Sequence, residues 1–237
     1  MLQSTNSNWR SLYRIAGIAA LLAVLLGLLE IGITYLPGGD APQETVLDRF
    51  TLFHDYPLMA LRNLGLVNMG LQVLTIPTFF ALYVAHREED SGYAVLATII
   101  AFVGVTVFFA TNRAFPMLTL SRQYIAASSD AQRAALIAAG QALLAVGESH
   151  TPGTFIAFSF PEVSGLVLSI VMLRGHIFSK TNAYVGILGF TFMLIFEVLT
   201  SFVPGMDSAA MLLAMPGGIL SMVWYVLLAL KLFKLEL

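Results

Sequence analysis

Six long apolar runs constrain the fold of this chain more than any other feature of its sequence. They lie near residues 12–36, 58–85, 93–115, 153–173, 183–204 and 208–233. Each run is long enough to cross a hydrocarbon layer about 30 Å thick as a helix, which takes about 20 apolar residues. Because only helices and closed barrels satisfy their backbone groups in lipid, the sequence predicts an all-α polytopic bundle of six transmembrane helices.

The composition agrees with this class and excludes several others. Of the 237 residues, 58% are hydrophobic and 11% are charged, against about 25% charged in soluble domains. Six spans leave only short connections and one longer segment, so we expect a single transmembrane domain over residues 1–237, with the lipid bilayer as its surroundings. The net charge of −2 argues against nucleic acid, whose binding needs several Lys or Arg contacts. The absence of cysteine excludes disulfides and thiolate metal sites.

The distribution of Lys and Arg predicts the orientation of the chain. With the N-terminus inside, seven basic residues lie on the inner side, and these are Arg10, Arg14, Arg87, Arg174, Lys180, Lys231 and Lys234. Five lie on the outer side, and these are Arg49, Arg62, Arg113, Arg122 and Arg133. Because inner connections carry the excess of Lys and Arg, we expect both termini to be cytoplasmic, with residues 37–57 and 116–152 outside.

The outer segment 116–152 contains one expected helix. Ser128-Ser129-Asp130 offers N-cap chemistry, an apolar-periodic stretch follows from Ala131 to Val146, and Gly147 closes it. This stretch is too short and too mixed to span. We expect an amphipathic outer helix near 130–147 that lies on the bilayer or caps the bundle, with a re-entrant hairpin as the alternative.

Ionisable residues inside the spans are the candidates for function, because each costs roughly 2.5 kcal/mol or more in hydrocarbon and usually faces a partner or water. Three carboxyl groups, of Glu30, Glu162 and Glu197, stand against two arginines, Arg62 and Arg113. The surplus carboxyl group must be protonated, hydrated or bound to a cation. Glu162 is the deepest of the three, and the others fall in the predicted outer half.

Helical phase places these groups on the small or polar faces of their spans, where another helix can approach closely. The sequence therefore predicts an outward-facing polar cavity, whose candidate ligand-binding residues are Glu30, Arg62, Asn68, Gln72, Asn112, Arg113, Glu162 and Glu197. The alternative is a bundle in which the same groups pair with one another and bind no ligand.

Two outer histidines, His54 and His150, are the candidates for a metal site together with one glutamate. No H-x-x-x-H or H-E-x-x-H spacing supports such a site, and solvated loop histidines explain the same residues. No G-x-S-x-G sequence is present. The sequence thus indicates no catalytic residue, leaves the cofactor unknown, and does not decide whether the chain is an enzyme.

Three short stretches resemble a widespread bacterial family of six-span integral membrane proteins of unknown function. They are Ser128-Ser129-Asp130-Ala131-Gln132-Arg133-Ala134-Ala135-Leu136, Arg174-Gly175-His176-Ile177-Phe178 with the following Gly186-Ile187-Leu188-Gly189, and Arg14-Ile15-Ala16-Gly17. The resemblance covers most of the chain. It implies the six-span topology and a bacterial inner membrane, and it implies no reaction.

Three functions remain after this reading. The polar faces and the surplus carboxyl group favour a protein that binds or transports a small molecule or ion through an intramembrane cavity. The second hypothesis is an accessory or structural subunit of a larger membrane complex, whose partners are other membrane subunits. The third is an intramembrane, lipid-directed hydrolase, with or without a metal.

Overall fold

The chain is helical throughout the part that its computed structural model describes, which comprises residues 9–34, 45–147 and 149–236. No strand occurs in these ranges. Six of the helices are long and apolar enough to cross a membrane. The predicted fold class, an all-α polytopic bundle, is therefore confirmed, and six such helices indicate a multi-pass membrane protein.

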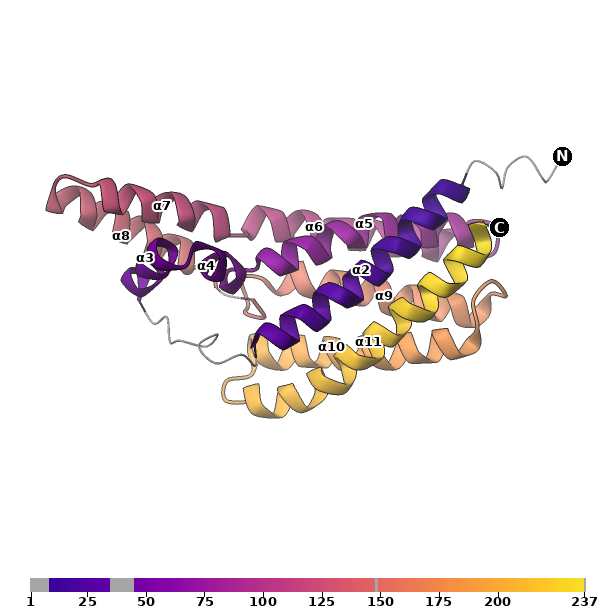
Figure 1. Cartoon of the computed structure of the whole chain (residues 1–237). Helices are drawn as coiled ribbons and strands as arrows, with labels where there is room; N and C mark the ends of the chain where they lie inside the picture. Colours follow the sequence, from indigo (N-terminus) through magenta and orange to yellow (C-terminus); the bar gives the residue numbers. More distant parts are fainter. Residues whose placement is uncertain (1–8, 35–44, 148, 237) are drawn as a thin grey trace.

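The six candidate spans form a closed ring. They are α2 (Arg10–Thr34), α5 (Leu66–His86), α6 (Ser91–Thr111), α9 (Phe155–Arg174), α10 (Lys180–Phe202) and α11 (Asp207–Glu236). Each packs against the next in that order, and α11 packs against α2 to close the ring. The start of α2 and the end of α11 lie at the same end of the bundle (Figure 1), which we call the terminal end.

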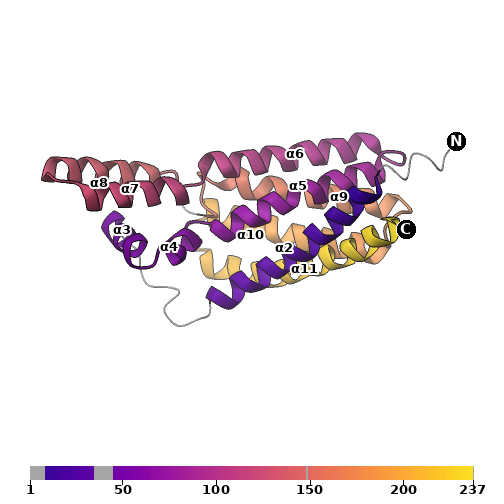
Figure 2. The same cartoon turned by 45° about the horizontal axis from the view of Figure 1, so that its top comes forward.

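Four shorter helices gather at the opposite end, which we call the hairpin end. They are α3 (Val46–Asp55), α4 (Pro57–Asn63), α7 (Ala114–Ala126) and α8 (Asp130–Leu144). α7 and α8 form an antiparallel pair that extends beyond the ends of the spans (Figures 1 and 2). α3 packs against both of them and α4 packs against α7, around a separate core that includes Phe50, Phe53 and Met117.

The run at 58–85, which we expected to be one span, is divided into α4 and α5. Gly65 separates them with a φ of +94°, a conformation that glycine adopts readily and other residues rarely do. The helix cannot continue through that angle, so the span begins at Leu66.

The helix expected in segment 116–152 is present as α8. Its N-cap is Ser129, whose side chain accepts a hydrogen bond from the backbone N–H of Gln132, and Gly147 follows its end at a φ of +100°. The expected outer connection 37–57 contains α3, which the sequence analysis did not predict. Residues 37–44 of that connection lie outside the described residues.

The terminal half of the ring is closely packed around Trp224, which is fully buried. Its indole ring packs against the rings of Phe79 and Phe190, at centroid distances of 6.4 and 5.1 Å. A Cβ at Gly186 would collide with this indole and with Ser169. Without the driving force of water, membrane helices associate by such close approach of small residues.

Candidate functional site

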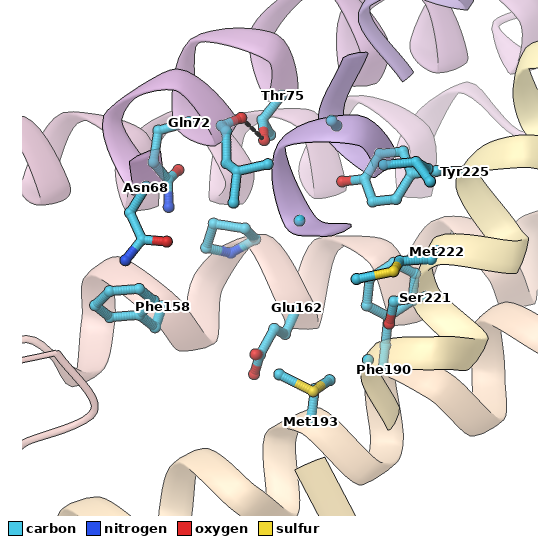
Figure 3. Close-up of a pocket in the computed structure, with 16 residues that line it drawn as sticks. Asn68, Gln72, Thr75, Phe158, Glu162, Phe190, Met193, Ser221, Met222 and Tyr225 are labelled. Atoms are coloured by element: carbon cyan, nitrogen blue, oxygen red, sulfur yellow. Dashed lines mark hydrogen bonds between the residues drawn. The ribbon is translucent and has the colours of Figure 1, made fainter. Parts of the chain in front are cut away.

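A cavity of about 250 Å³ lies inside the ring of spans (Figure 3). Five spans line it, namely α2, α5, α9, α10 and α11. Its polar side chains are Asn68, Gln72, Thr75, Glu162 and Ser221, and most of its apolar wall consists of Phe158, Phe190, Met193, Met222 and Tyr225. The wall is therefore largely aromatic and thioether-bearing, with a few polar groups set into it.

Glycine and proline residues shape this space. Gly27 and Gly218 line the cavity without side chains, and a Cβ added at Gly218 would meet no atom within 4 Å. Pro161 interrupts the hydrogen-bond ladder of α9, because proline has no N–H to donate, and its ring packs against Gly104 of α6. Gly218 thus leaves open space beside α11, whereas the end of the Met222 side chain lies close to Gly27.

Glu162 presents a carboxyl group to this cavity. Its Oε2 atom is buried and has no hydrogen-bond partner among the described residues. No Lys, Arg or His occurs among the cavity-lining residues in the described ranges. The carboxyl group of Glu197 lies close enough to act on Glu162 electrostatically. Nothing basic in the wall therefore neutralises an ionised Glu162.

Gln72 supplies a second acceptor on the opposite wall. Its side chain is 8% exposed, and its Oε1 atom has no hydrogen-bond partner within the described part of the chain. Asn68 lies one turn earlier on α5. Figure 3 shows both amides extending from α5 toward α9, while Glu162 extends from α9 toward α10. The cavity therefore holds buried acceptor atoms on two sides.

Glu197 has a partner, unlike Glu162. Its Oε2 atom lies 2.6 Å from Nδ1 of His150, and its side chain is fully buried whereas that of His150 is 33% exposed. The imidazole also packs against Phe158 and Phe196, at centroid distances of 4.5 and 5.0 Å. Because Phe158 lines the cavity, His150 stands behind the cavity wall, in the connection between α8 and α9.

Other predicted site residues form ion pairs or hydrogen bonds near the hairpin end. Nη2 of Arg62 lies 3.0 Å from Oε1 of Glu30, and Arg62 also donates to Oδ1 of Asn63. Asn112 donates to the carbonyl oxygen of Leu64 and accepts from the backbone N–H of Ala114. It therefore ties together the break between α4 and α5 and the break between α6 and α7.

The eight predicted site residues therefore separate into two groups. Asn68, Gln72 and Glu162 line the cavity, with Glu197 beside it. Glu30, Arg62, Asn112 and Arg113 do not line it, and Arg113, at the start of α7, is 7% exposed.

The apolar wall of the cavity and the contribution of α11 were not predicted from the sequence. In the sequence, Phe158, Phe190 and Met222 are ordinary apolar residues of a span, and Tyr225 is typical of the aromatic residues near a membrane interface. The signal that could have located α11 is the Pro216-Gly217-Gly218 sequence, where two consecutive side chains are absent.

The two metal candidates do not come together. Nδ1 of His54 lies 2.8 Å from Oδ1 of Asp55 on the exposed face of α3, whereas His150 pairs with Glu197. Across the residues that the structure describes, no three His, Cys, Asp or Glu side chains are grouped so that they could hold a metal ion.

Comparison with known families identifies the chain. The family model described as "Domain of unknown function (DUF4386)" matches residues 15–231, so the chain belongs to this family. The comparisons with curated proteins and with solved structures give no match.

Proposed function

We propose that this member of a family without an assigned function binds a small molecule in the cavity between its spans, as the binding step of transport across a membrane. The observation that carries the proposal is Glu162, a carboxyl group that faces a cavity and has no basic neighbour in the lining. A buried polar group without a partner costs free energy, and ionisable residues inside spans mark ligand or ion pathways.

The contrast with the other two carboxyl groups supports a binding role over a packed scaffold. Glu30 is paired with Arg62, and Glu197 is paired with His150. In a packed scaffold that binds no ligand, we would expect every carboxyl group inside the spans to have such a partner. Among the residues that the structure describes, Glu162 has no such pairing, and it borders the cavity. A ligand or water would complete its interactions.

The size of the cavity agrees with a small organic ligand. A cavity of about 150 Å³ in another protein holds benzene, and this one measures about 250 Å³. It therefore accommodates a molecule with one ring and a short polar group. Its mostly apolar wall with a few polar atoms is typical of small-molecule sites.

The lining helices support transport as the purpose of binding. α5, α9 and α11 carry Pro77, Pro161 and Pro216 inside helices that continue through them, and each proline removes a backbone hydrogen bond and gives its helix a point at which it can bend. We propose a bacterial inner membrane, as the family resemblance implies, with the terminal end in the cytoplasm, because seven of the twelve Lys and Arg residues lie at that end.

A matched pair of glycine variants tests the proposal. Gly218→Leu adds a side chain at a residue that lines the cavity, and Gly32→Leu adds the same side chain to α2; at both positions an added Cβ meets no atom within 4 Å. The probe is diisopropylcarbodiimide, a small apolar reagent that adds to protonated carboxyl groups and ends as a stable N-acylurea. Peptide mass mapping then measures the labelling of Glu162.

The wild type and Gly32→Leu should be labelled at Glu162, and Gly218→Leu should be labelled several-fold less. Equal labelling of Gly218→Leu would show that the cavity is not the route to Glu162. A wild type that resists the reagent would contradict the existence of a site open to small molecules.

A further inference from the structure

The chemistry of the cavity wall specifies more than a small molecule. Its unpartnered buried atoms include three oxygens, which are Oε2 of Glu162, Oε1 of Gln72 and Oγ of Ser221, none of which has a hydrogen-bond partner among the described residues. Carboxylate and amide oxygens only accept hydrogen bonds, and a hydroxyl oxygen accepts as well as donates. A ligand that satisfies this wall must therefore bring donors.

The charge of the wall points in the same direction. Glu162 and the nearby Glu197 both carry carboxyl groups, and no basic side chain of the described residues lines the cavity. An anionic ligand would meet an uncompensated carboxyl group. A neutral ligand would leave the carboxyl group of Glu162 either ionised without a counter-charge or protonated. A cation offsets that charge directly.

The apolar part of the wall suits an organic cation. Phe158, Phe190 and Tyr225 supply aromatic rings, whose faces attract ammonium groups. Met193 and Met222 supply flexible, polarisable thioethers that adapt to irregular apolar shapes. A bare inorganic cation would make little use of these groups, and the described residues offer no cluster of three acidic or histidine ligands for a metal ion.

From these observations we infer that the ligand of the proposed site is a small organic ammonium ion, with an apolar body about the size of a benzene ring and its N–H groups directed at Glu162 and Gln72. This inference rests on the proposed function. Folding has already removed Glu162 from bulk water, so the desolvation of the ligand and the loss of the proton from the carboxyl group oppose the ion pair.

Three shape-matched probes test the ligand class. Benzylamine is a cation at neutral pH, benzyl alcohol is its neutral analogue and benzoate is its anionic analogue. Binding to the full chain in lipid nanodiscs is measured by equilibrium dialysis with mass-spectrometric quantification. The amount bound by Gly218→Leu, which carries an added side chain at the cavity wall, is subtracted to remove partition into lipid.

We expect benzylamine to bind about tenfold more tightly than benzyl alcohol, a difference of about 1.4 kcal/mol, and benzoate to show no cavity-specific binding. Glu162→Gln should remove the preference for benzylamine and retain the binding of benzyl alcohol. Gln72→Leu keeps the carboxyl group and should weaken benzylamine more than benzyl alcohol. If Glu162→Gln does not fold, the Gln72→Leu variant still tests whether the polar wall favours the cation.

The outcomes separate the two proposals. Equal cavity-specific binding of benzylamine and benzyl alcohol, or preferential binding of benzoate, would overturn the ammonium class while the binding function stands. Absence of cavity-specific binding for all three probes would overturn both. A preference for benzylamine that survives in Glu162→Gln would overturn the role of that carboxyl group.

Discussion

The two halves of the ring are built from the same six helices, yet aromatic side chains fill the centre of one, and a partly open cavity lies at the centre of the other. In the terminal half, Trp224 fills the centre between Phe79 and Phe190. Toward the hairpin end, the centre is the cavity that Glu162 and Gln72 face. Phe190 belongs to both halves, because one side of it packs on Trp224 and it also lines the cavity.

The difference lies in what faces each glycine. A Cβ at Gly165 or Gly186 would collide with an aromatic ring of a neighbouring span, whereas a Cβ at Gly218 would meet no atom within 4 Å. Gly165 and Gly186 thus permit contact between neighbouring spans, whereas Gly218 leaves open space. Where a ring fills the gap, small residues permit tight packing, and where nothing fills it they leave space for a ligand.

The largest expected effect compares one side chain from each half. Trp224→Ala should lower the free energy of unfolding by about 3–5 kcal/mol, the range for removing a buried aromatic side chain. Met193→Ala should have a much smaller effect, because it enlarges a cavity that already exists. Thermal and denaturant unfolding in one detergent measure both. Equal losses would show that the two halves do not differ in packing.

The sequence predicts the six spans but not the packing of aromatic rings between them. Long apolar runs identify the spans, because length and hydropathy are properties of single segments. Which rings meet which glycines is a property of pairs of helices distant in sequence, such as Gly186 on α10 and Trp224 on α11. Periodicity predicts which face of a helix is packed, but it does not predict which other helix packs against that face.

Helical phase grouped Asn68, Gln72 and Glu162 among the polar-face residues of their spans, and all three line the cavity. It could not tell that Glu30 pairs with Arg62 nearer the hairpin end, because that contact depends on the break at Gly65 and the position of α4. It also missed α3, although Thr45 and Asp48 form a capping box, a signal that sequence spacing alone contains.

A smaller effect is expected at the boundary between the cavity and the hairpin end. His150→Phe retains a ring between Phe158 and Phe196 but removes the hydrogen bond to Glu197, leaving a buried carboxyl group without that partner. We expect a loss of about 1–3 kcal/mol in the free energy of unfolding. The control is His54→Phe, since an exposed pair of this kind contributes only about 0–1 kcal/mol.

Adding Glu197→Leu to His150→Phe should restore most of that loss, because removing both partners leaves no polar group unsatisfied. Denaturant unfolding of the single and double variants measures the coupling. If His150→Phe and His54→Phe had the same effect, the contact with Glu197 would contribute nothing to the boundary of the cavity.

The last comparison should leave stability unchanged and assigns each half to a side of the membrane. The chain has no cysteine, so one introduced thiol reports a single position. Ser128 is exposed between α7 and α8, and Ser91 is exposed at the start of α6 near the terminal end. In intact cells an impermeant maleimide should label Ser128→Cys, and it should label Ser91→Cys only after permeabilisation. This result would place the unfilled half toward the outside, where a ligand reaches Glu162 from the periplasmic face. The reverse labelling would turn the bundle over and make the cytoplasm the nearer source of the ligand, while the contrast between the two halves would remain.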